Sequence, residues 1–408
     1  MLALSVFILG IVILYAWKPV YSPFLERAHA QCPPGHPAGF LSTLHGELVD
    51  ATNCEVHLTG VNWFGFETST FAPHGLWVRN WQDMLNQIAR TGFNTIRLPY
   101  SNQLFDAAST PQGIDYKLNP DLKGLSGLAL MDKMIQGARS RGLKVILDRH
   151  DTTADVRPEL WYTDHVPETR WMQDWVMLAR HYRGNDTVIG ADLANEPHGP
   201  ATWGDGNAST DWRLAAQQAG NAILAANPEW LIIVEGIEQY HGDSYWWGGN
   251  LEGARQFPVN LSEPDKLVYS AHDYGPEIYE QSWFQAPNFP NNLPTVWQQH
   301  WAYLQMESNA PVLVGEFGGR SMGQDAGGVW QRSLVDFLKA HAINYTYWAW
   351  NPDSGDTGGI LQDDWTTVNQ AKLHILNAYQ WPMQGQSDAS TNSRAGAILN
   401  AYRWQRSK

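Results

Sequence analysis

Two glutamates occupy matching positions in the chain, because each follows a short apolar run. Glu196 comes after residues 190–194, within Asn195-Glu196-Pro197, and Glu316 comes after Val312-Leu313-Val314-Gly315. Each run is the length of a buried strand, and loops that follow parallel strands build the active site of an α/β barrel. A carboxyl pair can cleave an acetal: one group protonates the leaving oxygen, and the other stabilises or traps the oxocarbenium-like centre. This chemistry predicts that one carboxyl is protonated at rest and the other ionised.

Other polar and aromatic side chains end neighbouring apolar runs in the same way. The candidate site residues at these positions are Arg97, His150, Asn195, His272, Tyr274 and Trp348. Each has an ordinary structural alternative, such as a hydrogen-bonded histidine, a buried ion pair or a core tryptophan. Their shared position at strand ends favours one common site.

The periodicity predicts an α/β fold with eight short strands. We expect strands over residues 56–62, 95–98, 144–147, 188–194, 231–235, 267–272, 312–315 and 346–350, and helices over 79–90, 129–141, 212–226 and 329–340. Eight strands with intervening helices indicate a single-domain (β/α)8 TIM barrel. The phosphate-binding motif of nucleotide-binding folds follows none of these strands.

The composition excludes some partners and favours others. There are 41 acidic and 27 basic residues, and the net charge of -14 argues against nucleic acid. The 21 Trp and 16 Tyr suit a cleft that stacks against sugar rings, although a large barrel also buries many aromatic side chains.

The first 30 residues predict export. Residues 2–17 are almost continuously apolar, and Ala28-His29-Ala30 resembles a signal-peptidase site before Gln31. The run lacks a preceding Lys or Arg and lies about a dozen residues from this site, so a retained membrane anchor through residues 2–17 is the alternative. Either reading gives a secreted or extracytoplasmic protein.

We therefore expect a signal peptide or anchor over residues 1–30, an N-terminal arm over 31–55, a barrel domain over 56–380 and a tail over 381–408. Cys32 and Cys54 are the two cysteines. In an exported protein they form a candidate disulfide that ties down the arm, with two free thiols as the alternative.

Ten segments, in order, resemble glycoside hydrolase family 5, and especially its secreted bacterial endo-β-1,4-glucanases. They are GVNWFGFET, NTIRLPYS, LDRHD, NEPH, WRLAAQQAGNAIL, GDSYWWGGNL, LVYSAHDY, PNNLP, GEFG and WNPDSGDTGGIL. The resemblance implies a (β/α)8 barrel, retaining chemistry, and neither metal nor cofactor.

By this resemblance, Glu196 is the general acid/base and Glu316 the nucleophile. Arg97 and Tyr274 orient the nucleophile, Asn195 binds the sugar 2-hydroxyl, and the histidines hold the acid and the sugar. Three tryptophans are expected to stack on sugar rings: Trp348, Trp77 and Trp247.

The expected function is a monomeric retaining endo-β-1,4-glucanase that acts on soluble or amorphous β-glucan. Another β-glycan as substrate (mannan, xyloglucan, xylan or mixed-linkage glucan) and transglycosylation are the alternatives on the same scaffold. A non-catalytic carbohydrate-binding barrel is a third alternative.

Overall fold

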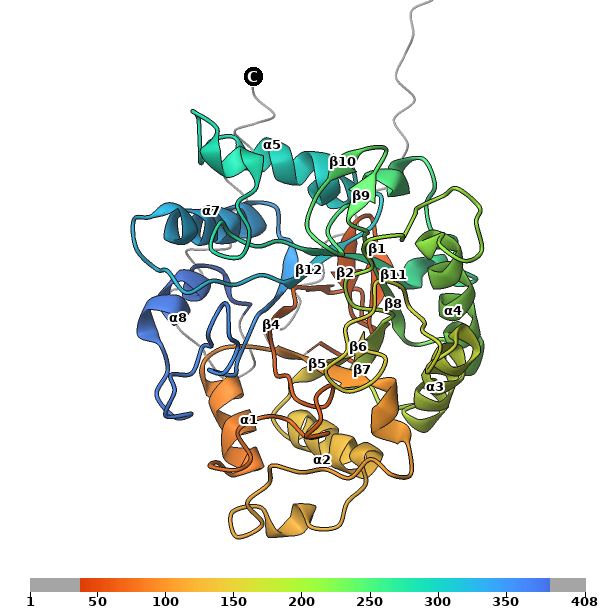
Figure 1. Ribbon diagram of the computed structural model, residues 1–408, viewed down its shortest axis with the longest axis vertical. Helices are drawn as coiled ribbons and strands as arrows, with labels where there is room; N and C mark the ends of the chain where they lie inside the picture. The colour runs from red at the N-terminus through yellow and green to blue at the C-terminus, as the bar shows by residue number, and fades with distance from the viewer. Residues whose placement is uncertain (1–36, 382–408) are drawn as a thin grey trace, which may run out of the picture. The chain divides into compact units, whose positions relative to one another are not determined.

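The computed structural model describes residues 37–381, and eight parallel strands form a closed barrel at its centre (Figure 1). In barrel order the strands are β11 (Leu267–His272), β12 (Val312–Glu316), β13 (Asn344–Tyr347), β4 (Thr59–Asn62), β5 (Thr95–Ser101), β6 (Lys144–Asp151), β7 (Val188–Asp192) and β8 (Leu231–Glu235). The predicted (β/α)8 fold is therefore confirmed. All five residues of β8, Leu-Ile-Ile-Val-Glu, are buried, as expected of a strand covered on both faces.

The predicted bounds of the first and last barrel strands were wrong. Residues 56–62 contain a break, because Glu55–Val56 is a strand of a separate antiparallel sheet and the barrel strand begins at Thr59. The last barrel strand is Asn344–Tyr347, so it starts and stops earlier than predicted. Trp348 consequently lies just beyond the strand, at the end of the barrel where loops gather.

Helices surround the barrel (Figure 1). They are α1 (Trp81–Arg90), α2 (Gly127–Arg139), α3 (Glu168–His181), α4 (Trp212–Ala226), α5 (Leu293–Trp297), α6 (Tyr303–Met306), α7 (Ala326–Ala340) and α8 (Gln370–Leu376), with a π-helical turn η6 (Gln298–Ala302) between α5 and α6. Short 3-10 helices are η1 (Asn102–Phe105), η2 (Pro120–Leu122), η5 (Ser282–Gln285) and η7 (Asn377–Tyr379). Side chains cap several helix starts: Asn80 accepts hydrogen bonds from two amides of α1, and Asp211 accepts one from α4.

The connection from β8 to β11 departs from the expected strand-helix alternation. It contains the hairpin β9 (Gln239–Tyr240) and β10 (Asp243–Ser244) and the 3-10 helices η3 (Glu252–Arg255) and η4 (Pro264–Lys266), with no α-helix among these described residues. Gly and aromatic residues dominate the segment 245–249, Tyr-Trp-Trp-Gly-Gly, and give it no amphipathic helical period. The segment is therefore available to form one wall of a cleft.

The described part of the N-terminal arm packs against the barrel. It forms a three-stranded antiparallel sheet of β1 (Ser42–Leu44), β2 (Glu47–Val49) and β3 (Glu55–Val56). Leu41, Leu48 and Val56 share an apolar cluster with residues of the barrel strands, including Ile146 and Leu313. This sheet adds apolar contacts to the barrel core.

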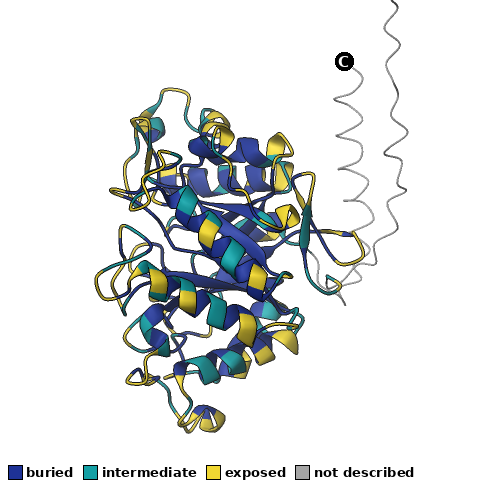
Figure 2. Cartoon of the chain, turned by 90° about the vertical axis from the view of Figure 1, so that its right-hand side faces the viewer, coloured by how far each residue is buried: buried dark blue, intermediate teal, exposed yellow. Residues whose placement is uncertain are grey.

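Many tryptophans lie in the interior of the barrel domain. Ten tryptophans are almost completely buried within the described residues: Trp63, Trp161, Trp171, Trp175, Trp212, Trp230, Trp297, Trp301, Trp330 and Trp350. Figure 2 shows the buried strands in dark blue and helices that expose one side to solvent. Much of the tryptophan content therefore reflects core packing, so the count by itself is weak evidence for a sugar-binding cleft.

Several predictions fall wholly or partly outside the described residues. These are the signal peptide or anchor over residues 1–30, most of the tail over 381–408, and Cys32. Cys54 is disulfide-bonded, and its pairing with Cys32 stays a prediction. Among residues 37–381, no helix is long and apolar enough to cross a membrane.

Candidate active site

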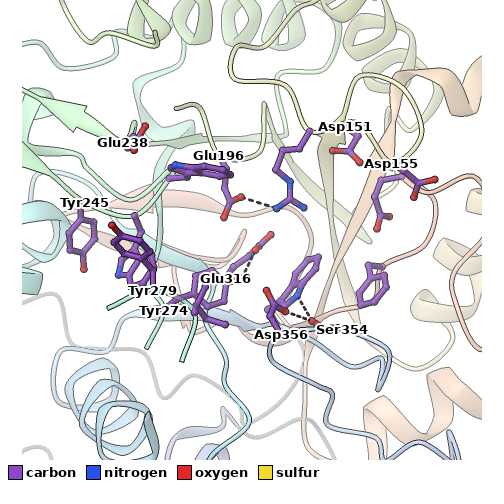
Figure 3. A pocket seen from close by; sticks show the side chains of 18 of the residues that line it. Asp151, Asp155, Glu196, Glu238, Tyr245, Tyr274, Tyr279, Glu316, Ser354 and Asp356 are labelled. Atoms are coloured by element: carbon purple, nitrogen blue, oxygen red, sulfur yellow. Dashed lines mark hydrogen bonds and ion pairs between the residues drawn. The ribbon is translucent and has the colours of Figure 1, made fainter. Parts of the chain in front are cut away.

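A cleft of about 1340 Å³ opens where the barrel strands end. Its walls come from the ends of β6 and β12 and from the loops after β4, β6, β7, β8, β11 and β13. In Figure 3, Glu196 and Glu316 lie near the middle, Asp151 and Asp155 lie on the right, and Tyr245 and Tyr279 lie on the left. The cleft thus contains both predicted catalytic carboxylates.

Glu316 is the last residue of β12 and is held by two strong donors. Arg97 Nη1 lies 2.6 Å from Glu316 Oε1, and the Tyr274 hydroxyl donates to Oε2 over 2.7 Å. These hydrogen bonds from a cation and a phenol hold both carboxyl oxygens of Glu316 in place. The Glu316 carboxyl group is therefore fixed in orientation and lines the cleft.

Arg97, from β5, is the centre of a fully buried charge network. Besides Glu316, its guanidinium lies within 3.1 Å of Asp148, Asp192 and Glu235. Burial opposes the charged form of Arg97, but these carboxylates raise its pKa well above the usual value. Burial also raises the pKa of Asp192 well above its usual range, since desolvation outweighs the attraction of Arg97. The network fixes Arg97 from several sides.

Glu196 lies four residues beyond β7 in a left-handed backbone conformation with φ of 51°. Its backbone N–H donates to Glu235 Oε2 over 2.7 Å, which supports this turn. The carboxylate contacts His272 Nδ1 through Oε1 at 3.0 Å and Arg157 Nη1 through Oε2 at 3.1 Å. Burial alone would raise the pKa of Glu196, but Arg157 and His272 lower it to about 2.

This protonation state differs from the expectation for a resting proton donor. The prediction that neighbours raise the pKa of the acid was wrong, because two cationic side chains contact Glu196 directly. Arg157 was not predicted, since it lies in an irregular loop.

The two glutamates are close enough to act on one bond. One oxygen of Glu196, one oxygen of Glu316 and a ring nitrogen of His272 all lie within 4.8 Å of one another. Retaining glycosidases hold their carboxyl groups about 5–5.5 Å apart, and inverting enzymes hold them about 6.5–9.5 Å apart. The upper limit of 4.8 Å on the oxygen separation lies below the inverting range and agrees with double-displacement chemistry.

The two buried histidines have different hydrogen-bonding states. His272 Nδ1 faces Glu196, and its Nε2 lies 3.2 Å from Glu235 Oε1, so both nitrogens face carboxylates. Burial opposes protonation, but the carboxylates raise the pKa of His272 well above its usual value. His150 Nδ1 lies 2.7 Å from Asp148, and its Nε2 lies 2.7 Å from Arg157 Nη2.

Asn195 and Trp348 offer groups for a bound sugar. Asn195 Oδ1 accepts a hydrogen bond from Arg97 over 3.1 Å, while its buried Nδ2 has no hydrogen-bond partner among the described residues. Trp348 lines the cleft, with its ring nearly parallel to those of Phe64 and His150. An unpaired buried donor in the site and an aromatic face in the cleft wall suit a ligand with hydroxyl groups.

The two remaining predicted platforms differ in position. Trp247 lines the cleft, is 43% exposed, and stacks on His198 with ring centroids 3.8 Å apart. Trp77 is 37% exposed but does not line this cleft, and its ring contacts His74 and Trp365. The structure therefore brings together the other nine predicted residues, either in the cleft wall or in direct contact with it, and leaves Trp77 outside the wall.

Comparison with known sequences identifies this arrangement. The sequence pattern of Cellulase (glycosyl hydrolase family 5) matches residues 49–354. The chain belongs to glycosyl hydrolase family 5.

Relatives within family 5 cover most of the chain. An endoglucanase of Paenibacillus polymyxa is 53% identical over 85% of this chain and 88% of its own length. The major extracellular endoglucanase of Xanthomonas campestris pv. campestris is 44% identical over 84% of this chain and 71% of its own length. A cellotetraose complex of the Pyrococcus horikoshii endocellulase is 43% identical, with a TM-score of 0.78 over 84% of this chain and 99% of that one.

The family 5 site also contains charged residues that were not predicted as site residues. Asp192 and Glu235 each end a barrel strand, and Asp148 lies within β6, so charged side chains at the ends of buried apolar strands were a usable signal. Glu67 lies in the loop after β4 and lines the cleft, where burial raises its pKa to about 7. No strand-end pattern marks Glu67 or Arg157.

Proposed function

We propose that this chain is a retaining endo-β-1,4-glucanase that hydrolyses internal bonds of soluble or amorphous β-glucan. The observation that carries the proposal is the pair Glu196 and Glu316, with carboxylate oxygens within 4.8 Å in an aromatic-lined cleft. The endoglucanases of Paenibacillus polymyxa and Xanthomonas campestris support the choice of glucan.

The first step forms a covalent glycosyl-enzyme. A Glu316 oxygen attacks the anomeric carbon while the bond from that carbon to the leaving oxygen breaks, and Glu196 gives its proton to the leaving oxygen. The second step reverses these roles. Glu196 takes a proton from water, the water oxygen attacks the same carbon, and Glu316 leaves as a carboxylate, so both glutamates return to their starting states.

The contacts around Glu316 suit the nucleophile. Arg97 and Tyr274 hold its two oxygens in fixed directions, so the attacking oxygen is oriented before substrate binds. We assign the unpaired Nδ2 of Asn195 to the sugar 2-hydroxyl, because a buried donor without a partner gains a hydrogen bond there. Trp348 and Trp247 provide aromatic faces along the cleft.

The decisive experiment combines substrate choice with removal of each carboxylate. A protein lacking residues 1–30 is assayed on carboxymethylcellulose, mixed-linkage glucan, xyloglucan, xylan and glucomannan. Rapid release of mixed short oligomers from carboxymethylcellulose is expected. Glu196→Ala and Glu316→Ala should each reduce turnover by orders of magnitude, while the exposed, distant Glu263→Ala serves as the matched control.

Two results would contradict the proposal. A preference for mannan over glucan would show that the proposed substrate is wrong. Binding of oligosaccharides without hydrolysis would indicate a non-catalytic carbohydrate-binding barrel. Retention is tested separately by proton NMR of the first product formed from cellotetraose. The β-anomer must appear first, since two inversions at the anomeric carbon restore its configuration.

We further propose that the enzyme is exported and acts as a monomer outside the cytoplasm. The apolar run over residues 2–17 and the cleavage pattern at Ala28-His29-Ala30 support export, as does the extracellular relative of Xanthomonas campestris. N-terminal sequencing of exported protein should begin at Gln31, whereas an intact N-terminus would favour the membrane anchor. Sedimentation equilibrium tests the monomer.

A further inference from the structure

Arg157 differs from every other charged residue that lines the cleft. Eight carboxylate side chains line it within the described part of the chain: Glu67, Asp151, Asp155, Glu196, Glu238, Glu316, Asp353 and Asp356. Arg157 is the single Lys or Arg among these lining residues. It lies in the loop between β6 and α3, and its side chain is 40% exposed, so it is less enclosed than the strand-end network around Arg97.

The guanidinium of Arg157 bridges two residues of the site. Nη1 lies 3.1 Å from Glu196 Oε2, and Nη2 lies 2.7 Å from His150 Nε2. A guanidinium N–H can only donate, so the second contact makes His150 Nε2 an acceptor and places the ring proton on Nδ1, toward Asp148. In this arrangement Arg157 binds the ionised form of Glu196.

That contact opposes the first step of the proposed reaction. Glu196 must carry a proton when the glycosidic bond breaks, and the leaving oxygen must come within about 3 Å of it. Arg157 competes for the same carboxylate. The other groups facing Glu196 are His272, Glu235 and Tyr274 on or after β8 and β11, His150 on β6, and Glu316 on β12.

These other groups are buried and attached to the barrel strands or the residues directly after them, whereas Arg157 extends from a loop. An alternative position for its guanidinium lies nearby. Asp151 is buried, lines the cleft, attracts Arg157 electrostatically, and has a carboxylate oxygen without a hydrogen-bond partner in the described chain. Asp155 also lines the cleft, on the same side as Asp151 in Figure 3.

We propose that Arg157 is a positioning residue that holds Glu196 as a carboxylate before substrate binds, and that bound glucan displaces its guanidinium toward Asp151. Displacement removes one of the two cations in contact with Glu196 and leaves the negative charge of Glu316 nearby, so Glu196 takes up the proton that it donates. This inference rests on the proposed roles of the two glutamates.

The test compares two pH profiles of the same enzyme on cellotetraose. The profile of kcat/KM reports groups of the free enzyme, and that of kcat reports groups of the enzyme-substrate complex. In the wild type, the basic limb of kcat/KM is expected at a lower pH than that of kcat. Arg157→Gln should move the kcat/KM limb upward by about one pH unit or more and leave the kcat limb in place. Arg255→Gln, at an exposed ion pair with Glu307, should move neither limb.

A second substrate separates proton donation from other effects of the substitution. The dinitrophenolate released from 2,4-dinitrophenyl β-cellobioside leaves without a proton, so formation of the glycosyl-enzyme from this substrate does not need Glu196 as an acid. The pH profile of that step should therefore lack the basic limb that depends on Glu196, in the wild type and in Arg157→Gln alike. Three results would overturn the proposed displacement of Arg157. They are basic limbs of kcat/KM and kcat that coincide in the wild type, limbs that do not move in Arg157→Gln, and an equal movement of both limbs in that variant. Failure of the proposed function gives a different result: Glu196→Ala would then hydrolyse cellotetraose normally.

Discussion

The guanidinium of Arg97 lies 2.6 Å from the carboxylate of Glu316, and the same side chain contacts three further buried carboxylates. This one residue therefore connects the position of the proposed nucleophile with the stability of the barrel interior. Substitutions around it should separate the two roles.

Arg97→Met should reduce both stability and activity. Removing the guanidinium leaves several buried carboxylates without their cation, and breaking a buried ion pair costs about 3–5 kcal/mol. Urea unfolding measures the loss of stability, and kcat/KM on cellotetraose measures the loss of activity. Arg255→Met removes an arginine from an exposed ion pair and is the control, for which less than about 1 kcal/mol is expected. Equal stability losses in the two variants would contradict the assigned role of Arg97.

Tyr274→Phe should reduce activity and leave the fold intact. The substitution removes the hydroxyl that donates to Glu316 Oε2 over 2.7 Å. A hydrogen bond to a charged group contributes about 1.5–3 kcal/mol, so kcat/KM should fall by about 10- to 100-fold. Tyr269→Phe removes a buried hydroxyl that accepts a hydrogen bond from the Val259 amide, outside the cleft. That control should retain wild-type kcat/KM, and a similar loss in both variants would point to a general packing effect.

Glu67 should make the protein less stable as the pH rises toward neutrality. Burial raises its folded-state pKa to about 7 from an ordinary value of 4.5. Between these values the folded state holds the proton and the unfolded state releases it, so the free energy of unfolding falls with increasing pH. The contribution present below pH 4.5 is lost as the pH passes 7, and it amounts to about 3 kcal/mol.

Glu67→Gln tests this directly, because the amide does not titrate. Urea unfolding at pH 5, 6 and 7 should show a flatter dependence on pH in the variant, with its largest relative gain at pH 7. Parallel curves for wild type and variant would show that Glu67 does not titrate in this range.

Trp247→Ala should weaken substrate binding more than it affects stability. The ring is 43% exposed, lines the cleft, and is held by stacking on His198. Loss of an aromatic stacking contact costs about 1 kcal/mol, which corresponds to a rise in KM of about fivefold. Trp77→Ala is the comparison variant, because Trp77 has similar exposure but lies outside the cleft lining. A larger KM effect at Trp77 than at Trp247 would reverse this assignment.

The repeated pattern of apolar runs ending in polar residues was sufficient to predict the barrel. It also predicted site residues that lie on the barrel strands. Glu316 ends β12 and Arg97 lies in β5, so their positions follow directly from strand periodicity. The break between β3 and β4 was not predictable in this way, because Val56 and Leu58 continue the apolar pattern across it. Tertiary pairing with β2 separates the two strands.

The electrostatic state of the site was harder to predict than its composition. The sequence places Glu196 and His272 far apart in the chain, and only the closed barrel brings His272 Nδ1 to 3.0 Å from Glu196. Arg157 reaches the same carboxylate from a loop without regular periodicity. The direction and the size of the Glu196 pKa shift therefore depend on tertiary contacts that the sequence patterns of strands and helices do not specify.

The ten buried tryptophans have a consequence for optical measurements. Indoles enclosed in an apolar interior emit at shorter wavelengths than indoles in water, so emission from the native chain is weighted toward the core. Trp246, Trp247 and Trp348 are the tryptophans that line the cleft in the described chain. Intrinsic fluorescence should consequently report global unfolding as a large red shift, whereas occupancy of the cleft by an oligosaccharide changes the environment of a small minority of the emitters.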